Sequence, residues 1–208
     1  MQQLDESLRR LKTDYLDLWQ IHEVVYEDDP DLHFAPNGAT EALLEAKQQG
    51  KVRFIGFTGH KHPQIHLKML GRDFPFDACQ MPLNVFDGTY RSFEREVLPV
   101  LNQRGIAALG MKSLSGNAEP IKQGIVTPEE AIRYVLSLPI VSLVSGIDSP
   151  QVLRQNLDIA RRFRPMTVAE MDGLRTRVAQ YAMDGRYELF KSTNRYDGGI
   201  GRAQHGIS

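Results

Sequence analysis

Polar side chains recur at the ends of short apolar runs along this sequence. Each run is rich in β-branched and aromatic residues and ends in a group that can form hydrogen bonds or carry charge. These groups are His22, Thr58, Gln80, Lys112 with Ser113, and Ser145 with Gly146. Packing of a core does not require such groups, although many strands end in polar residues for other reasons. The pattern identifies candidates for a site but does not define its chemistry.

Histidines are the first candidates for catalysis or metal binding. A lone histidine at the end of a strand, such as His22, is more often structural than catalytic when nothing else is known. His60 and His62 flank a lysine and have the character of exposed residues, and no second histidine or carboxylate stands at a convincing metal spacing. We therefore expect no metal site.

The apolar runs predict five strands, and longer stretches with helical periodicity follow them. The runs are nearly continuous in apolar character, as in parallel strands that are covered on both faces. The strands are expected at residues 15–22, 52–58, 76–80, 106–111 and 141–145. Glycine, proline and capping threonine or serine residues delimit helices at about 41–49, 63–70, 93–104, from 128 onward, 149–162 and from 167 onward.

Alternation of strands and helices predicts an α/β fold with right-handed crossovers. A doubly wound dinucleotide fold should carry Gly-x-Gly-x-x-Gly after an early strand, and the only glycine cluster, at residues 198–201, follows no strand. A (β/α)8 barrel is the better interpretation, although five units leave it incomplete. We expect one domain over residues 1–208, with the units at 1–165, a helix at 166–183 and a tail at 184–208.

Composition excludes several classes of function. The 208 residues carry a net charge of −1, which gives no electrostatic basis for binding nucleic acid or an anionic membrane. Cys79 is the single cysteine, so no intrachain disulfide can form. No apolar run is long enough to cross a bilayer and no signal peptide is evident, so we expect a soluble, cytoplasmic protein.

Four segments together resemble the aldo-keto reductase family in order and spacing. They are residues 7–22, 50–58, 110–114 and 146–150, the last leading to Gln155 and Asn156. The resemblance implies a barrel of which this chain carries strands 4–8. It also implies hydride transfer from a nicotinamide cofactor, usually NADPH with NADH as an option, to the carbonyl of a small-molecule substrate.

The resemblance assigns roles to individual residues around the nicotinamide. His22 falls on the family's active-site histidine, which orients and polarises the carbonyl. Thr58 and Gln80 fall on residues that bind the carboxamide, and Met111 replaces an aromatic ring that often stacks on the nicotinamide. The loop of Lys112, Ser113, Leu114 and Gly116 matches the one that follows the pyrophosphate.

The adenosine end and one carboxamide contact depart from the family pattern. The matching segment contains Gly146, Asp148, Ser149, Gln155 and Asn156, with Ser149 at a helix start that suits a phosphate. The family's basic clamps are replaced by Gly146 and Val152, with Arg154 as a possible substitute. Gly59 stands where the family has asparagine, so that His60 is the candidate for the missing contact.

The family's catalytic aspartate, tyrosine and lysine have no counterpart here, since no Asp-x-Ala-x-x-Tyr-Gly motif occurs and Lys112 lies on a later strand. Three explanations stand: a fragment of an ordinary reductase, a non-catalytic nucleotide-binding or regulatory remnant, or a split barrel that another chain completes. The open strand edges predict self-association. Turnover by the chain alone would point to Tyr26 or Tyr90 as the proton donor.

Overall fold

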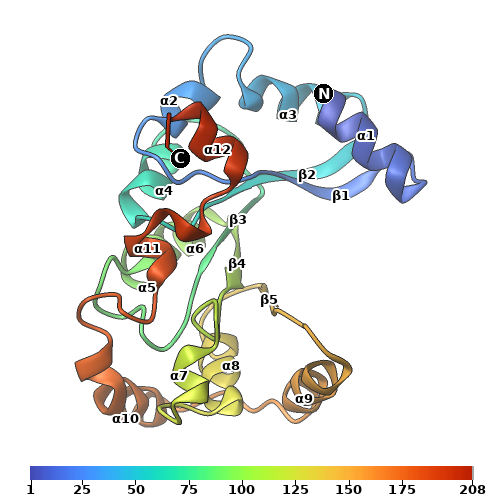
Figure 1. Cartoon of the computed structure of the whole chain (residues 1–208). Coiled ribbons are helices and arrows are strands. Elements are labelled where there is room, and N and C mark those ends of the chain that lie inside the picture. Colours follow the sequence, from blue (N-terminus) through green and yellow to red (C-terminus); the bar gives the residue numbers. More distant parts are fainter. Residues whose placement is uncertain (208) are drawn as a thin grey trace.

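The computed structural model describes residues 1–207 and shows one parallel sheet of five strands (Figure 1). Each strand pairs with its sequence neighbour, so the order in the sheet is the order in the chain. The strands are β1 (Leu16–Ile21), β2 (Val52–Thr58), β3 (Ala78–Pro82), β4 (Ala107–Met111) and β5 (Ser142–Val144). The predicted α/β fold and all five strands are confirmed, with ends that shift by up to two residues.

Helices follow every strand, and the chain forms an open arc with α1 and α9 near its two ends (Figure 1). The strands β1 and β5 are the edges of the sheet, and large apolar side chains near them remain exposed, including Val141, Val144 and Tyr15. The helices between and around the strands are α1 (Gln2–Leu11), α2 (Asp29–His33), α3 (Ala39–Gln48), α4 (Pro63–Leu70), α5 (Phe93–Glu96), α6 (Leu98–Arg104), α7 (Glu119–Lys122), α8 (Pro128–Leu136), α9 (Pro150–Arg161) and α10 (Val168–Val178).

Local sequence explains most helix ends. Thr127 and Thr167 each cap a helix in a reciprocal capping box with Glu130 and Glu170, as their spacing predicts. The single helix predicted over 93–104 is wrong, because it divides at Val97 into α5 and α6. Pro99 lies in the first turn of α6, where its missing N–H is tolerated, whereas it could not continue a helix from Phe93.

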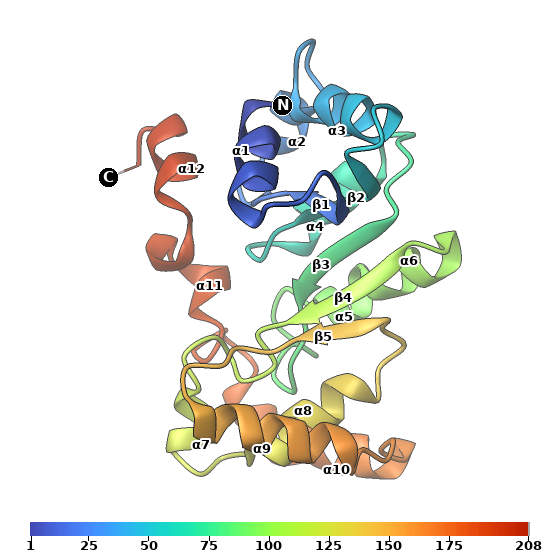
Figure 2. The same cartoon turned by 90° about the vertical axis from the view of Figure 1, so that its right-hand side faces the viewer.

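The C-terminal tail, residues 184–207, is more ordered than the sequence suggests. It contains α11 (Leu189–Ser192), the 3-10 turn η2 (Asn194–Tyr196) and α12 (Gly199–Gln204), and the 3-10 turn η1 (Ala179–Tyr181) precedes it. Figure 2 shows α11 and α12 along one side of the sheet. Phe190 and Lys191 are fully buried there, so the tail is a structural layer and not a surface loop. Within residues 1–207, no helix has the length and apolar character needed to span a bilayer.

Candidate functional site

The register of the sheet brings the predicted nicotinamide residues into one row. Ile21 pairs with Phe57, which sets His22 level with Thr58, and Thr58 pairs directly with Gln80. Gln80 Nε2 lies 3.4 Å from Met111 Sδ at the end of the next strand. We call His22, Thr58, Gln80 and Met111 the strand-end row. Sequence reasoning placed these residues at strand ends, and the structure brings them to one edge, although Met111 pairs with Pro82, two residues beyond Gln80.

Exposure differs along the strand-end row. The His22 side chain is 74% exposed and borders a hollow of about 770 Å³ that also contacts α1 and the tail. Thr58 is buried, whereas Gln80 and Met111 are half-buried. Within the strand-end row, the His22 side chain is therefore the most accessible to solvent.

Gly59 differs from the family pattern for a steric reason. A Cβ atom at this position would lie 2.1 Å from the carbonyl oxygen of Val24 and 2.6 Å from Cε1 of His66. The loop after β1 is held in this place because the Val24 N–H donates to the Thr58 carbonyl at 2.7 Å. An asparagine side chain has no space here, because the segment that follows β1 and the His66 ring lie against this position.

His60 is buried, contrary to the sequence prediction of an exposed residue. Its Nδ1 lies 3.3 Å from Glu23 Oε2 and its Nε2 lies 3.4 Å from Asp197 Oδ1. Burial and the nearby Lys112 ammonium lower the pKa of His60 to about 4, so the ring is neutral at pH 7. The sequence prediction failed because the residue that covers the His60 ring, Asp197, belongs to the tail and lies 137 positions away in the sequence.

The loop after β4 carries unusual backbone conformations and unused polar groups. Lys112, Ser115 and Gly116 have positive φ angles of 57°, 60° and 76°. Among the described residues the buried Ser115 hydroxyl has no hydrogen-bond partner. The Lys112 ammonium faces the rings of Phe190 and Tyr196 at 5.3 and 5.8 Å, and burial lowers its pKa. Ser113 is buried and Leu114 packs against the core.

Residues predicted for the adenosine end lie on the loop between β5 and α9 and on α9 itself. Ser149 caps α9 by accepting a hydrogen bond from the Val152 N–H. Asn156 donates to the Ser145 hydroxyl at 3.0 Å and to the Gly146 carbonyl, while Gln155 donates to Asn156. Asn156 thus shapes the loop, whereas Gly146, Asp148 and Arg154 are exposed at the surface.

A buried ionic cluster attaches the tail to the loop after β3, and sequence reasoning missed it. Lys191 Nζ donates to Asp87 Oδ1 at 2.5 Å, to Glu188 Oε1 at 2.8 Å and to the Tyr90 carbonyl at 2.9 Å. Asn84 donates to Glu188, and the second Glu188 oxygen has no partner among residues 1–207. The spacing of three residues between Glu188 and Lys191 is typical of an ion pair within one helical turn, but only the fold shows that both side chains are buried.

Stability should fall with rising pH because of Glu188. Burial raises the pKa of Glu188 from 4.5 to about 7 in the folded protein. The folded state therefore holds a proton between these values that the unfolded chain has lost, and the free energy of unfolding decreases across that window. Urea unfolding at pH 5 and pH 8 should show a smaller decrease for E188Q than for the wild type. An equal decrease in E188Q and in the exposed control E129Q would contradict this assignment.

One set of potential metal ligands exists in the described chain. Asp28, Asp29 and His205 place ligand atoms within 4.8 Å of one another. Asp29 Oδ2 already accepts from the N–H groups of Val25 and Tyr26, and His205 Nε2 lies 3.1 Å from Asp28. Hydrogen bonding to the Gly201 carbonyl and the two carboxylates raise the pKa of His205, so an ion pair between tail and loop satisfies these groups.

The fold and the strand-end row define a class: parallel α/β half-barrels with polar groups at the carboxyl ends of the strands. The profile of the aldo/keto reductase family matches residues 1–119, and the chain belongs to that family. The oxidoreductase YqkF of Bacillus subtilis is 27% identical over 84% of this chain and 64% of its own length. The aldo-keto reductase AFTS1 of Alternaria alternata is 31% identical over 61% of this chain and 34% of its own length.

Solved structures agree with this fold. The holo form of aldo-keto reductase AKR11C1 from Bacillus halodurans superposes with a TM-score of 0.69 and 21% identity, over 90% of this chain and 66% of that one. The chain spans less than two thirds of the length of the curated relatives named above.

Proposed function

We propose that the chain provides the nicotinamide-binding half of an oxidoreductase that reduces a small carbonyl compound. The observation that carries this proposal is the strand-end row, in which His22, Thr58, Gln80 and Met111 stand side by side. Hydrogen-bond donors on consecutive strand ends suit a planar carboxamide, and an accessible imidazole suits a carbonyl oxygen.

The loop after β4 supports the binding of a dinucleotide. Within residues 1–207, the buried Ser115 hydroxyl has no hydrogen-bond partner and the Lys112 ammonium has no ion-pair partner. A phosphate group could accept a hydrogen bond from the first and pair with the charge of the second. When bound, the reduced nicotinamide would supply the hydride. Gln80 and Thr58 would fix the orientation of its ring, while His22 would donate a hydrogen bond to the carbonyl oxygen. NADPH is the proposed cofactor, with NADH as the alternative because the adenosine end lacks a basic clamp.

A proton donor for the product alkoxide is not evident in the strand-end row. Tyr26 donates its hydroxyl to Asp197 at 3.0 Å, and burial together with this carboxylate raises the pKa of Tyr26 to about 12. Tyr90 packs its ring against Gly185 and under Arg91. Both tyrosines have structural contacts, so the proposal places the proton donor outside this row.

Cofactor titration tests the proposal. NADPH fluorescence should report saturable binding, and Q80L should weaken it about tenfold through loss of one or two hydrogen bonds, roughly 1.4 kcal/mol. The exposed variant Q103L serves as the matched control and should bind as the wild type does. Turnover of aldehydes, ketones and quinones should require a longer chain that supplies a tyrosine donor. Equal affinity of Q80L and Q103L would exclude the strand-end row as the nicotinamide site.

A further inference from the structure

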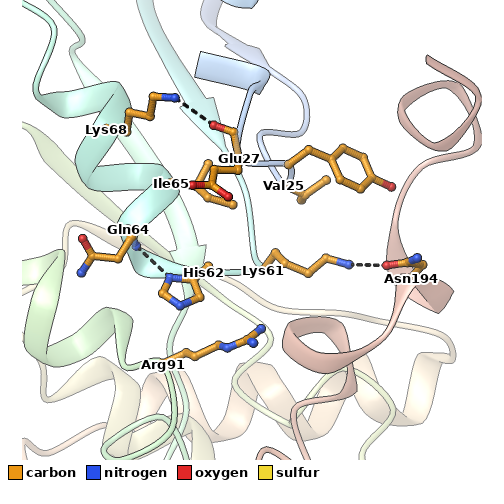
Figure 3. A pocket seen from close by; sticks show the side chains of 10 residues that line it. Val25, Glu27, Lys61, His62, Gln64, Ile65, Lys68, Arg91 and Asn194 are labelled. Atoms are coloured by element: carbon orange, nitrogen blue, oxygen red, sulfur yellow. Dashed lines mark hydrogen bonds between the residues drawn. The ribbon is translucent and has the colours of Figure 1, made fainter. Parts of the chain in front are cut away.

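A second cavity lies apart from the strand-end row and shares none of its residues. Its volume is about 550 Å³, and the loops after β1 and β2, the helix α4, Arg91 and Asn194 of the tail surround it (Figure 3). This volume is within the range of small-molecule sites, roughly 300–1,000 Å³. Val25 and Ile65 are apolar residues, and most of the other residues that line the cavity carry a polar or charged group.

Cationic side chains outnumber carboxylates in the lining of this cavity. Three permanent cations, Lys61, Lys68 and Arg91, line it together with a single carboxylate, that of Glu27. Figure 3 shows Lys61, His62 and Arg91 at one end of the cavity and Lys68 at the other. Lys61 and Lys68 are neutralised outside the cavity, because they pair with Asp197 and Asp31 at 2.6 Å.

Arg91 keeps its charge available to the cavity. Its Nη1 donates to the Lys191 carbonyl at 2.6 Å, and within residues 1–207 its guanidinium forms no ion pair. A guanidinium has five N–H donors, so most of them stay free for a planar anion. Arg91 also has a φ angle of 45°, a left-handed conformation that is rare outside glycine and often occurs at binding sites.

His62 adds a neutral donor whose tautomer is fixed. Its Nδ1 accepts a hydrogen bond from the Gln64 N–H at 3.1 Å, which leaves the ring proton of the neutral form on Nε2. Burial and the Arg91 charge lower the pKa of His62, opposed by Glu96 and Glu27, so the neutral form prevails at pH 7. Both His62 and Arg91 therefore present donors and no acceptor.

We propose that this cavity is a binding site for the anionic group of a small organic molecule, a carboxylate or a phosphate ester, held by Arg91 and His62. The site is additional to the dinucleotide site and does not depend on the proposed function. Since Asn194 belongs to the tail, a bound anion would also link the tail to the loops after β1 and β2.

Side-chain NMR tests this proposal directly. Signals of the Arg91 Nε–H and the His62 Nε2–H should shift saturably with inorganic phosphate or with acetate, but not with sodium chloride at equal ionic strength. The two anions distinguish a phosphate site from a carboxylate site. R91Q should weaken binding at least tenfold, and R95Q, an exposed arginine of the neighbouring helix, should change it less than about twofold.

Two further measurements keep the result unambiguous. R91K retains the charge without the planar fork and should show intermediate affinity, even if R91Q perturbs the fold. Saturating NADPH should leave anion binding unchanged. Absence of saturable shifts with both anions, equal affinity in R91Q and R95Q, or displacement of the anion by NADPH would overturn the proposal.

Discussion

Replacing Lys191 with methionine should lower the free energy of unfolding by about 3–5 kcal/mol, because a buried charge would lose its partner. The side chains of Lys191 and Asp87 are both completely buried, and Asp87, whose pKa burial already raises, would be left without its cation in an apolar environment. The N–H groups of Phe93 and Glu94 donate to Asp87 but cannot replace a full positive charge. Urea denaturation followed by circular dichroism measures the loss.

The exposed pair of Lys68 and Asp31 provides the matched control. Its side chains are 38% and 53% exposed, so K68M should cost roughly 0–1 kcal/mol. The double variant K191M/D87N should be more stable than K191M, because it also replaces the Asp87 carboxyl group that K191M leaves without its cation. Similar losses in K191M and K68M would show that the cluster does not hold the tail in place.

Restoring the family asparagine at Gly59 should destabilise the protein by about 3 kcal/mol and should not improve cofactor binding. The close atoms, Val24 O and His66 Cε1, belong to buried and packed groups that cannot move aside without breaking β1–β2 contacts. G59A should show nearly the full loss, because the Cβ atom alone causes the overlap. Thermal unfolding of both variants, together with NADPH titration, measures the two effects.

Gly173 offers a control of opposite sign. It lies within α10 and a Cβ atom there would meet nothing within 4 Å, so G173A should be stabilised by up to about 1 kcal/mol through helix propensity. Tighter NADPH binding by G59N than by the wild type would mean that the loop after β1 can leave this position.

The sequence was sufficient to predict the strand order and the strand-end row, because both follow from local signals. Apolar runs mark the strands, and in a parallel sheet of sequential neighbours their ends must meet at one edge. The break between α5 and α6 was also encoded locally, in Pro99, but was overlooked among apolar residues that continue the helical period.

Features that depend on the tail could not be predicted from local signals. The burial of His60, the ion cluster of Lys191 and the aromatic contacts of Lys112 all join residues that are far apart in the chain. The composition of the tail predicted a surface loop, since a segment rich in glycine, arginine and tyrosine is typical of surface loops. Only the placement of α11 at the carboxyl ends of the strands turns these residues into a core.

The sequential pairing of β1 to β5 has a consequence for how the chain acquires its structure. Each new strand can add to a partner that has already left the ribosome, so the sheet can grow one unit at a time without waiting for distant segments. The tail behaves differently, because its anchors at Asp87 and His60 lie 104 and 137 positions upstream. During synthesis the polar edge of the sheet would therefore stay uncovered until the tail emerges, well after all five strands.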